Sequence, residues 1–244
     1  LIYGDNDVML VAPASSGLNV IFSSANPGVA VVSGATLKVT GAGSTTITAS
    51  QPGNNNFYTA PDAVVNLVVS KAGQEILFTE PDPVVYGSAP VTAEAFSTSG
   101  LPVTFNVSDP SVAAVNGNTI TIKSAGTTMI TARQEGNANY NPAGDKSVIL
   151  KVEKAGLTVT AEDKSKSYLS PVPDLSFSCS GFVNGDDISV LDNLPVAATR
   201  ARNDSPAGEY EITVSGGEDD CYSFIYLPGI LMIMKADQQV SFIS

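Results

Sequence analysis

Apolar and polar side chains alternate in short stretches along this chain, a pattern that predicts β-strands rather than helices. Ile120 and Ile122 alternate with Thr119 and Thr121, which gives that stretch one buried and one solvent-facing side. Asn116-Gly117 directly precedes it and is a strong signal for a tight hairpin. Strands are predicted at 74–79, 91–96, 102–107, 111–115, 118–123, 126–133 and 146–153. Seven short strands within about 80 residues predict an immunoglobulin-like β-sandwich.

The chain repeats itself with a shift of 83 residues. Residues 1–72 align with residues 84–155 without a gap, and 32 of the 72 positions are identical. Ser16–Phe22, for example, aligns with Ser99–Phe105. Internal identity at this level marks a repeated structural unit, so we expect a second sandwich of the same kind ahead of the first.

The two copies differ at their beginnings. The second copy opens with Lys71–Phe78, which the first copy lacks, and the last ten residues, Lys235–Ser244, repeat this opening. We therefore expect a fragment of a longer array, with any export signal and anchor elsewhere. The predicted organisation is an immunoglobulin-like domain lacking its first strand at 1–71, a complete one at 72–154, a third domain at 155–235, and the first strand of a further repeat at 236–244.

The repeated unit resembles a known family. Pro110–Val115 followed by Lys123–Ala132 is similar to the bacterial immunoglobulin-like (Big) domains of surface proteins and adhesins. The strand Gly126–Ala132 recurs in the first copy as Gly43–Ala49, which makes the resemblance fairly specific. It implies a β-sandwich that serves as a stalk or binding unit and has no catalytic residues.

Residues 156–235 do not align with the repeat and resemble another family. Leu157–Ala161, Tyr168, Leu175–Phe182 and Gly208–Val214 are similar to the MBG domain of bacterial surface proteins, a β-grasp-like module related to mucin-binding repeats. Where that family has Tyr-Gly, this chain has Tyr168-Leu169, so we expect a different turn there.

Two local features of this third domain carry predictions of their own. Asp186–Leu191 is predicted to form a single helical turn, with Asn184 as its cap. A closing hairpin is predicted through Pro228-Gly229. The predicted fold class is therefore mainly all-β: two immunoglobulin-like β-sandwiches in tandem plus a β-grasp-like domain with at most one short helix.

Composition and charge exclude several classes of function. Hydrophobic residues make up 43% of the chain and charged residues 15%, so it can bury cores. The net charge is −12, and such an acidic field repels phosphates, so we expect no nucleic-acid partner. The most apolar segment, Ile225–Met234, is interrupted by Pro228-Gly229, so we expect no membrane insertion in this segment.

No motif for catalysis, cofactor binding or metal binding is present, and we predict that the chain is not an enzyme. The absence of histidine removes a Ser–His pair and leaves two cysteines with too few partners for a zinc site. Asp186-Asp187 and Glu218–Asp220 are clusters of acids, but they lack the spacing of a calcium loop and read as solvated turns.

The two cysteines, Cys179 and Cys221, both fall in the third domain. Their occurrence in one domain allows a disulfide between them. The apolar residues around them, Phe177, Tyr222 and Phe224, equally allow two buried free thiols. Both alternatives stay open.

The Asn-rich corners of the two copies are candidate ligand loops. A turn that needs positive φ, with an aromatic side chain folded onto the end of the sandwich, accounts for them. The functional alternative is a sugar-binding loop in which the aromatic ring serves as a platform for the sugar. Tyr3 and Tyr86 occupy equivalent places and are predicted to serve core or edge packing. The candidate loop residues are Asn54, Asn56 and Phe57 in the first copy and Asn137, Asn139 and Tyr140 in the second.

These observations favour a non-catalytic structural or adhesive repeat segment of a bacterial cell-surface or secreted protein. The Lys-Ala junctions at 71–72, 154–155 and 235–236 leave almost no slack between units, which predicts a semi-rigid stalk. The alternatives are a carbohydrate- or mucin-binding module and an accessory region of a larger secreted enzyme. The expected partners are a host or cell-surface glycan, mucin or protein, and head-to-tail strand pairing through 238–242 of a second molecule.

Overall fold

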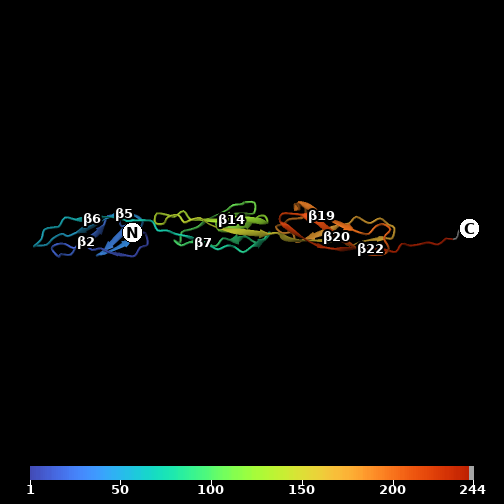
Figure 1. The fold of residues 1–244 in the computed structure, drawn as a ribbon, viewed down its shortest axis with the longest axis horizontal. Coiled ribbons are helices and arrows are strands. Elements are labelled where there is room, and N and C mark those ends of the chain that lie inside the picture. The colour runs from blue at the N-terminus through green and yellow to red at the C-terminus, as the bar shows by residue number, and fades with distance from the viewer. Residues whose placement is uncertain (242–244) are drawn as a thin grey trace. The chain divides into compact units, whose positions relative to one another are not determined.

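The computed structural model describes residues 1–241 and consists almost entirely of β-strands (Figure 1). The fold is all-β, with two immunoglobulin-like sandwiches in tandem followed by a β-grasp-like domain, as the sequence predicts. Within the described residues the single helical element is a 3-10 turn, η1 (Ile188–Val190). None of the helices in this part of the chain is long and apolar enough to cross a membrane.

The chain divides into two compact units. The first comprises Leu1–Thr79, Glu94–Phe105 and Thr131–Ser147, and the second comprises the remaining described residues. The first sandwich therefore lies wholly in the first unit and the β-grasp-like domain in the second. The strands of the second sandwich are distributed over both units.

The first sandwich consists of two three-stranded antiparallel sheets, with strand orders β1-β4-β3 and β2-β5-β6. Ala30, Leu37 and Ile47 form its core and come from both sheets. Alternation places these side chains inward and their neighbours outward. The strands are β1 (Val8–Met9), β2 (Ile21–Ser24), β3 (Ala30–Ser33), β4 (Thr36–Val39), β5 (Gly43–Ser50) and β6 (Ala63–Val69).

The second sandwich repeats this plan and adds an opening strand that pairs antiparallel with β10. Its sheets have the orders β10-β7, β12-β13-β9 and β11-β14-β15-β8. The strands are β7 (Ile76–Phe78), β8 (Val84–Val85), β9 (Val91–Thr92), β10 (Ala95–Ser97), β11 (Thr104–Val107), β12 (Ala113–Asn116), β13 (Thr119–Ile122), β14 (Gly126–Arg133) and β15 (Lys146–Glu153).

The strand predictions for the second sandwich hold with two differences. The predicted strand 91–96 is two strands, because β9 pairs with β13 whereas β10 pairs with β7 in another sheet. The short strand β8 was not predicted; it pairs in parallel with β15, a contact between distant segments that local alternation does not reveal. The predicted hairpin after Asn116 is confirmed, since Asn116 pairs with Thr119 and Gly117 has a φ of 59°.

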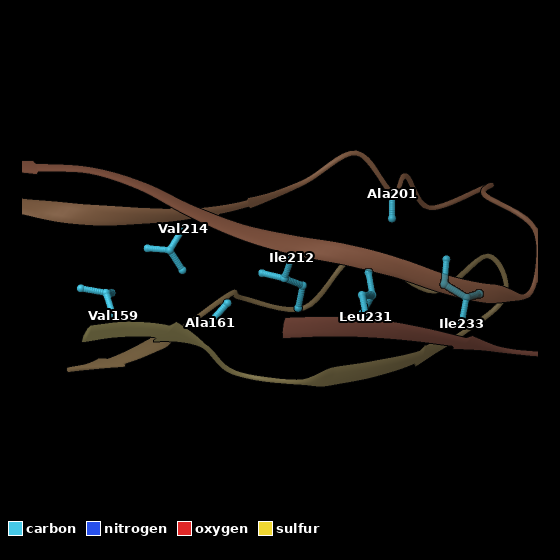
Figure 2. Packing of buried hydrophobic residues seen from close by; sticks show 7 residues of the cluster. All are labelled: Val159, Ala161, Ala201, Ile212, Val214, Leu231 and Ile233. Carbon is cyan, nitrogen blue, oxygen red and sulfur yellow. The ribbon is translucent and has the colours of Figure 1, made fainter. Parts of the chain in front are cut away.

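The β-grasp-like domain has two sheets, with orders β18-β16-β21 and β17-β22-β20-β19. Figure 2 shows the core side chains projecting toward one another from strands of both sheets. Val159, Ile212 and Leu231 belong to this core, and all three are fully buried. The strands are β16 (Ala155–Ala161), β17 (Lys164–Ser167), β18 (Phe177–Ser180), β19 (Asn193–Thr199), β20 (Gly208–Glu218), β21 (Tyr222–Leu227) and β22 (Gly229–Met234).

The closing hairpin predicted through Pro228-Gly229 is wrong. Strands β21 and β22 flank this dipeptide as expected, but β21 pairs with β16 and β22 pairs with β17 and β20. The chain thus crosses from one sheet to the other at Pro228, which has no N–H to contribute to a ladder. A side chain at Gly229 would have its Cβ 2.6 Å from the backbone oxygen of Ala161, which explains the glycine at this crossing.

The helical turn predicted within 186–191 forms, but its cap is different. Asp187 has extended backbone angles, and its carboxylate accepts a hydrogen bond from the Ser189 backbone N–H at 2.8 Å. The predicted cap, Asn184, instead has a φ of 58° in the preceding turn. The hydrogen bonds from the Ser189 hydroxyl and N–H hold the pKa of Asp187 below its ordinary value.

Leu169 follows Tyr168 at the position where the MBG family usually has glycine, and its φ is 70°. This is the left-handed region, which costs a residue with a side chain roughly 1–2 kcal/mol. Leu169 is 63% exposed, so it recovers little of that cost by burial.

Replacing this residue, Leu169→Gly, should therefore stabilise the third domain by about 1 kcal/mol, after allowing for the greater freedom of glycine in the unfolded chain. Urea unfolding followed through the amide resonances of residues 157–232 measures the change. Asn184→Gly is the matched control and should gain less, because asparagine tolerates this region. A lower unfolding midpoint for Leu169→Gly would show that the leucine is there for packing.

Candidate functional site

The Asn-rich corner of the second sandwich is a fixed turn. The Asn137 side-chain oxygen accepts hydrogen bonds from the backbone N–H groups of Asn139 at 2.8 Å and Tyr140 at 2.9 Å. Gly136 precedes it with a φ of 74°, and a Cβ there would lie 2.5 Å from the Tyr140 oxygen. Only glycine fits this position.

This corner contacts the first sandwich, and we call the contact the first joint. Lys71 Nζ donates to the Asn137 backbone oxygen at 2.7 Å, and the Ala72 N–H donates to the Asn139 oxygen at 2.9 Å. The Asn139 side-chain oxygen accepts from the Ala42 N–H of the first sandwich at 2.9 Å. All these residues lie in the first compact unit.

An aromatic pair completes the first joint. The rings of Tyr140 and Tyr3 meet edge to face, with centroids 5.3 Å apart and planes at 84°. The Tyr3 N–H donates to the Ser70 oxygen at 2.9 Å, which places the ring beside the strand that leads to Lys71. Such pairs contribute about 0.5–1.5 kcal/mol beyond the area that they bury.

A second joint has the same construction where the β-grasp-like domain follows the second sandwich. Here the corner residue is Asp219, whose carboxylate accepts from the N–H groups of Cys221 at 2.7 Å and Tyr222 at 2.9 Å. Lys154 Nζ donates to the Asp219 backbone oxygen at 2.8 Å, and the Ala155 N–H donates to the Cys221 oxygen at 2.9 Å. These residues all belong to the second compact unit.

The aromatic contact of the second joint is more extensive. Tyr222, which is only 1% exposed, meets Tyr86 at a centroid distance of 5.6 Å and Phe182 at 5.3 Å. Both tyrosine hydroxyls donate to one Asp186 carboxylate oxygen, at 3.0 Å from Tyr86 and 2.7 Å from Tyr222. A Cβ at Gly87 would lie 2.5 Å from a methyl carbon of Val183, so the backbone of this end fits closely against the next domain.

The two joints therefore share one design on two different folds. In each, a Lys-Ala pair binds a capped corner, and the aromatic residue three positions after the cap packs on the tyrosine of the preceding sandwich. The Tyr86 N–H donates to the Glu153 oxygen at 2.8 Å, as Tyr3 does to Ser70. Sequence reasoning predicted core or edge packing for Tyr3 and Tyr86 and so missed this role. Their occurrence at equivalent positions of both copies was the available signal.

The candidate loop residues thus fall into two groups. Asn137, Asn139 and Tyr140 make the contacts of the first joint. In the first sandwich, the Asn54 side-chain oxygen accepts from the N–H groups of Asn56 at 2.8 Å and Phe57 at 3.0 Å, so the corner is built in the same way. There Phe57 is 49% exposed and the following Tyr58 is 99% exposed.

Both cysteines are free thiols in the structure. Cys179 packs beside the core of the β-grasp-like domain, and burial raises the pKa of its thiol. Cys221 lies at the second joint, with its sulfur 3.4 Å from the Ser124 hydroxyl. Among the described residues, no three acidic or cysteine side chains gather where they could hold a metal ion.

Comparison with known families assigns the third domain. Residues 157–232 match the family model described as MBG domain (YGX type), which confirms the resemblance seen in the sequence. An MBG domain behind two tandem sandwiches supports a repeat-type extracellular module. The comparison with curated proteins found no match.

The matches of this chain to solved structures have low TM-scores. The chain matches Drosophila N-cadherin EC1-3 with 10% identity and a TM-score of 0.36, over 94% of this chain and 92% of that one. It matches domains 1-6 of the surface layer protein SbsC with 14% identity and a TM-score of 0.28, over 92% of this chain and 36% of that one. Bacteroides ovatus SGBP-B, solved with a mixed-linkage heptasaccharide, matches with 14% identity and a TM-score of 0.22, over 96% and 65%. At such scores these likenesses assign no ligand and no role.

The Tyr222 hydroxyl gives the second joint a pH dependence. Burial, together with the Asp186 charge and hydrogen bond, raises the pKa of Tyr222 from 10.0 to about 12. A raised pKa means that the folded state favours the neutral phenol. The associated stability is present below the ordinary pKa and is lost as the pH rises through the raised one.

We therefore expect the second joint to weaken between pH 10 and pH 12, the window set by these two pKa values. Tyr222→Phe should cost about 1 kcal/mol at neutral pH, the typical value of a hydrogen bond, and should remove part of the alkaline loss. Hydrogen exchange at the Ala155 and Tyr222 amides measures both effects. Tyr58→Phe, at a fully exposed ring, is the control; equal alkaline loss in wild type and Tyr222→Phe would contradict this account.

Proposed function

We propose that the chain is a non-catalytic repeat segment of an extracellular or surface protein whose work is mechanical. It spaces and orients whatever lies at the two ends of the array. The observation that carries this proposal is that one joint design occurs twice, with its corner once on a sandwich and once on the β-grasp-like domain. Each joint combines a lysine hydrogen bond and a backbone hydrogen bond to a capped corner with an aromatic pair, so bending there breaks several contacts together.

The proposal extends to a semi-rigid stalk of a bacterial cell-surface or secreted protein. The Lys-Ala pairs at 71–72 and 154–155 are themselves hydrogen-bonded to the next corner and supply no flexible linker. The MBG match and the net charge of −12 suit a soluble, exported array that stays clear of anionic surfaces. Adhesion, in this proposal, is the function of the loops and edges that such a stalk displays.

Small-angle X-ray scattering tests the stalk. A compact protein of this length would have a radius of gyration of about 18 Å, and we expect a clearly larger value. Gly87→Ala should broaden the distribution of interatomic distances, because the new methyl group overlaps Val183. Gly4→Ala is the matched control, since Gly4 has a similar φ of 92° but nothing within 4 Å of its Cβ position.

Adding Val183→Gly to Gly87→Ala should restore the wild-type scattering curve, since it removes the Val183 Cβ and both of its methyl groups from the overlap. A wild-type radius of gyration near the compact value would contradict the stalk. Indistinguishable curves for Gly87→Ala and Gly4→Ala would contradict the role of the second joint in stiffness.

A second candidate function, carbohydrate or mucin binding, is favoured by one observation. Phe57 and Tyr58 are both exposed beside the Asn54 corner, and exposed aromatics next to amide side chains suit a sugar ring. Binding to a glycan and mucin panel should then fall at least tenfold in a Phe57→Ala, Tyr58→Ala double variant, an effect of about 1.4 kcal/mol. A panel with no binding to the wild-type chain would remove this candidate.

A further inference from the structure

The contacts inside the chain, at its two joints, carry a further inference. Residues 235–241 form no strand, and residues 242–244 lie outside the described residues, so the strand pairing expected through 238–242 stays a prediction. Both joints lie wholly within the described residues. They can be compared position by position, because the two sandwiches are copies of one another.

The two sandwiches present nearly the same residues to the domain that follows them. They share a Tyr-Gly pair, an alanine directly before β5 or β14, and the Lys-Ala pair. The equivalent positions are Tyr3 and Tyr86, Gly4 and Gly87, Ala42 and Ala125, Lys71 and Lys154, and Ala72 and Ala155. Directly before the shared alanine, however, the first sandwich has Gly41 and the second has Ser124.

In the first joint this position is small, and the corner residue beside it is long. The Asn139 side-chain oxygen accepts from the Ala42 N–H at 2.9 Å. A Cβ at Gly41 would lie 3.3 Å from that same oxygen, so a larger residue there would press on the amide. The glycine also serves its own sandwich, because the same Cβ would overlap the Gly28 backbone oxygen.

In the second joint the sizes are reversed. Cys221 takes the place of Asn139, since its backbone oxygen accepts from the Ala155 N–H as that of Asn139 does from the Ala72 N–H. Its side chain is shorter, and its sulfur lies 3.4 Å from the Ser124 hydroxyl. The contact across this joint is therefore shared between a longer side chain on the sandwich and a shorter one on the corner.

The other contacts that distinguish the second joint require no change in the sandwich. The Tyr86 hydroxyl binds Asp186, and Gly87 allows the close approach of Val183. The first sandwich has the same tyrosine and the same glycine at the equivalent positions. These contacts strengthen the joint to an MBG domain, but they do not distinguish the two sandwiches.

We propose that the residue before the shared alanine and the residue two positions after the cap form a matched pair, which selects the domain that each sandwich accepts. Glycine opposite asparagine selects a sandwich corner, and serine opposite cysteine selects the corner of the MBG domain. Serine against asparagine crowds the amide away from the backbone N–H. Glycine against cysteine makes neither the amide hydrogen bond nor the sulfur–hydroxyl contact.

Selection of this kind depends on penalties for the wrong partner as much as on contacts to the right one. The proposal rests on the proposed function, because only a joint that holds two domains together can select between them.

A double-mutant cycle in the full chain tests the pair, with hydrogen exchange at the Ala155 amide as the measure of joint opening. Cys221→Asn should reduce the protection of this amide roughly fivefold, about the effect of one lost hydrogen bond, because the larger side chain meets Ser124. Ser124→Gly should reduce it by a smaller factor. The double variant should return to within roughly twofold of wild type, because the introduced amide can then accept from the Ala125 N–H as in the first joint.

Cys221→Ala is the matched control, since it removes the sulfur without adding bulk and should cost less than Cys221→Asn. The amides of Leu150 and Leu231, both fully buried, report whether each domain stays folded. Losses that simply add in the double variant would overturn the proposal, as would a Cys221→Asn chain in which Ala155 is better protected than in wild type. A wild-type Ala155 amide that exchanges like a solvated one would contradict the proposed function itself, and this proposal with it.

The first joint provides the reverse test. Asn139→Cys should lower the protection of the Ala72 amide roughly fivefold, because the Ala42 N–H loses its acceptor and the space beside Gly41 is left unfilled. Asn139→Asp keeps an acceptor oxygen at the same place and should stay close to wild type. Equal losses in these two variants would overturn the role of the amide oxygen in selection.

Discussion

The capped corner is the element on which the rest of this molecule depends. One side-chain oxygen, from Asn137 or Asp219, satisfies two backbone N–H groups and fixes the chain direction for the next three residues. That turn leaves a backbone carbonyl free for the lysine of the preceding linker and projects a tyrosine from the end of the domain. The cap makes few demands on the sequence, since an Asn or Asp at one position suffices.

The corner explains how two unrelated folds can follow one another in one chain. A sandwich and an MBG domain share no core and no strand order, yet each offers a capped corner of the same design to the Lys-Ala pair that precedes it. Recognition is mostly by backbone atoms, and the side chains that add to it differ between the joints. In the first, an amide of Asn139 meets the Ala42 N–H. In the second, Asp186 gathers two tyrosine hydroxyls, which makes this joint sensitive to ionisation.

Much of this fold could be predicted from the sequence, because the repeat and the alternation are local signals. The hairpin at Asn116 and the turns at the Asn-rich corners follow from residues that adopt positive φ. The failures in strand pairing share one physical cause, which is that pairing between distant segments leaves no local trace. Pro228-Gly229 has the composition of a hairpin but joins strands of different sheets, and β8 is identified only by its partner β15.

The candidate site was predicted only in part, again because contacts between residues far apart in sequence leave no local pattern. The corner residues stood out, but their role did not, since the partners of Asn139 and Tyr140 lie far away in sequence at Ala42 and Tyr3. Tyr86 and Asp186 are 100 positions apart and show no common pattern. Lys235-Ala236 repeats the Lys-Ala pairs at 71–72 and 154–155 in the sequence. The two joints show what such a pair binds.

The central claim is that the joints couple neighbouring domains, and ¹⁵N relaxation tests it most directly. If the joints hold, the amides of the first sandwich, the second sandwich and the MBG domain will report one common, anisotropic tumbling. Gly87→Ala will then release the MBG domain alone. Three independent and faster correlation times in the wild-type chain, each fitting a single small domain, would contradict the account.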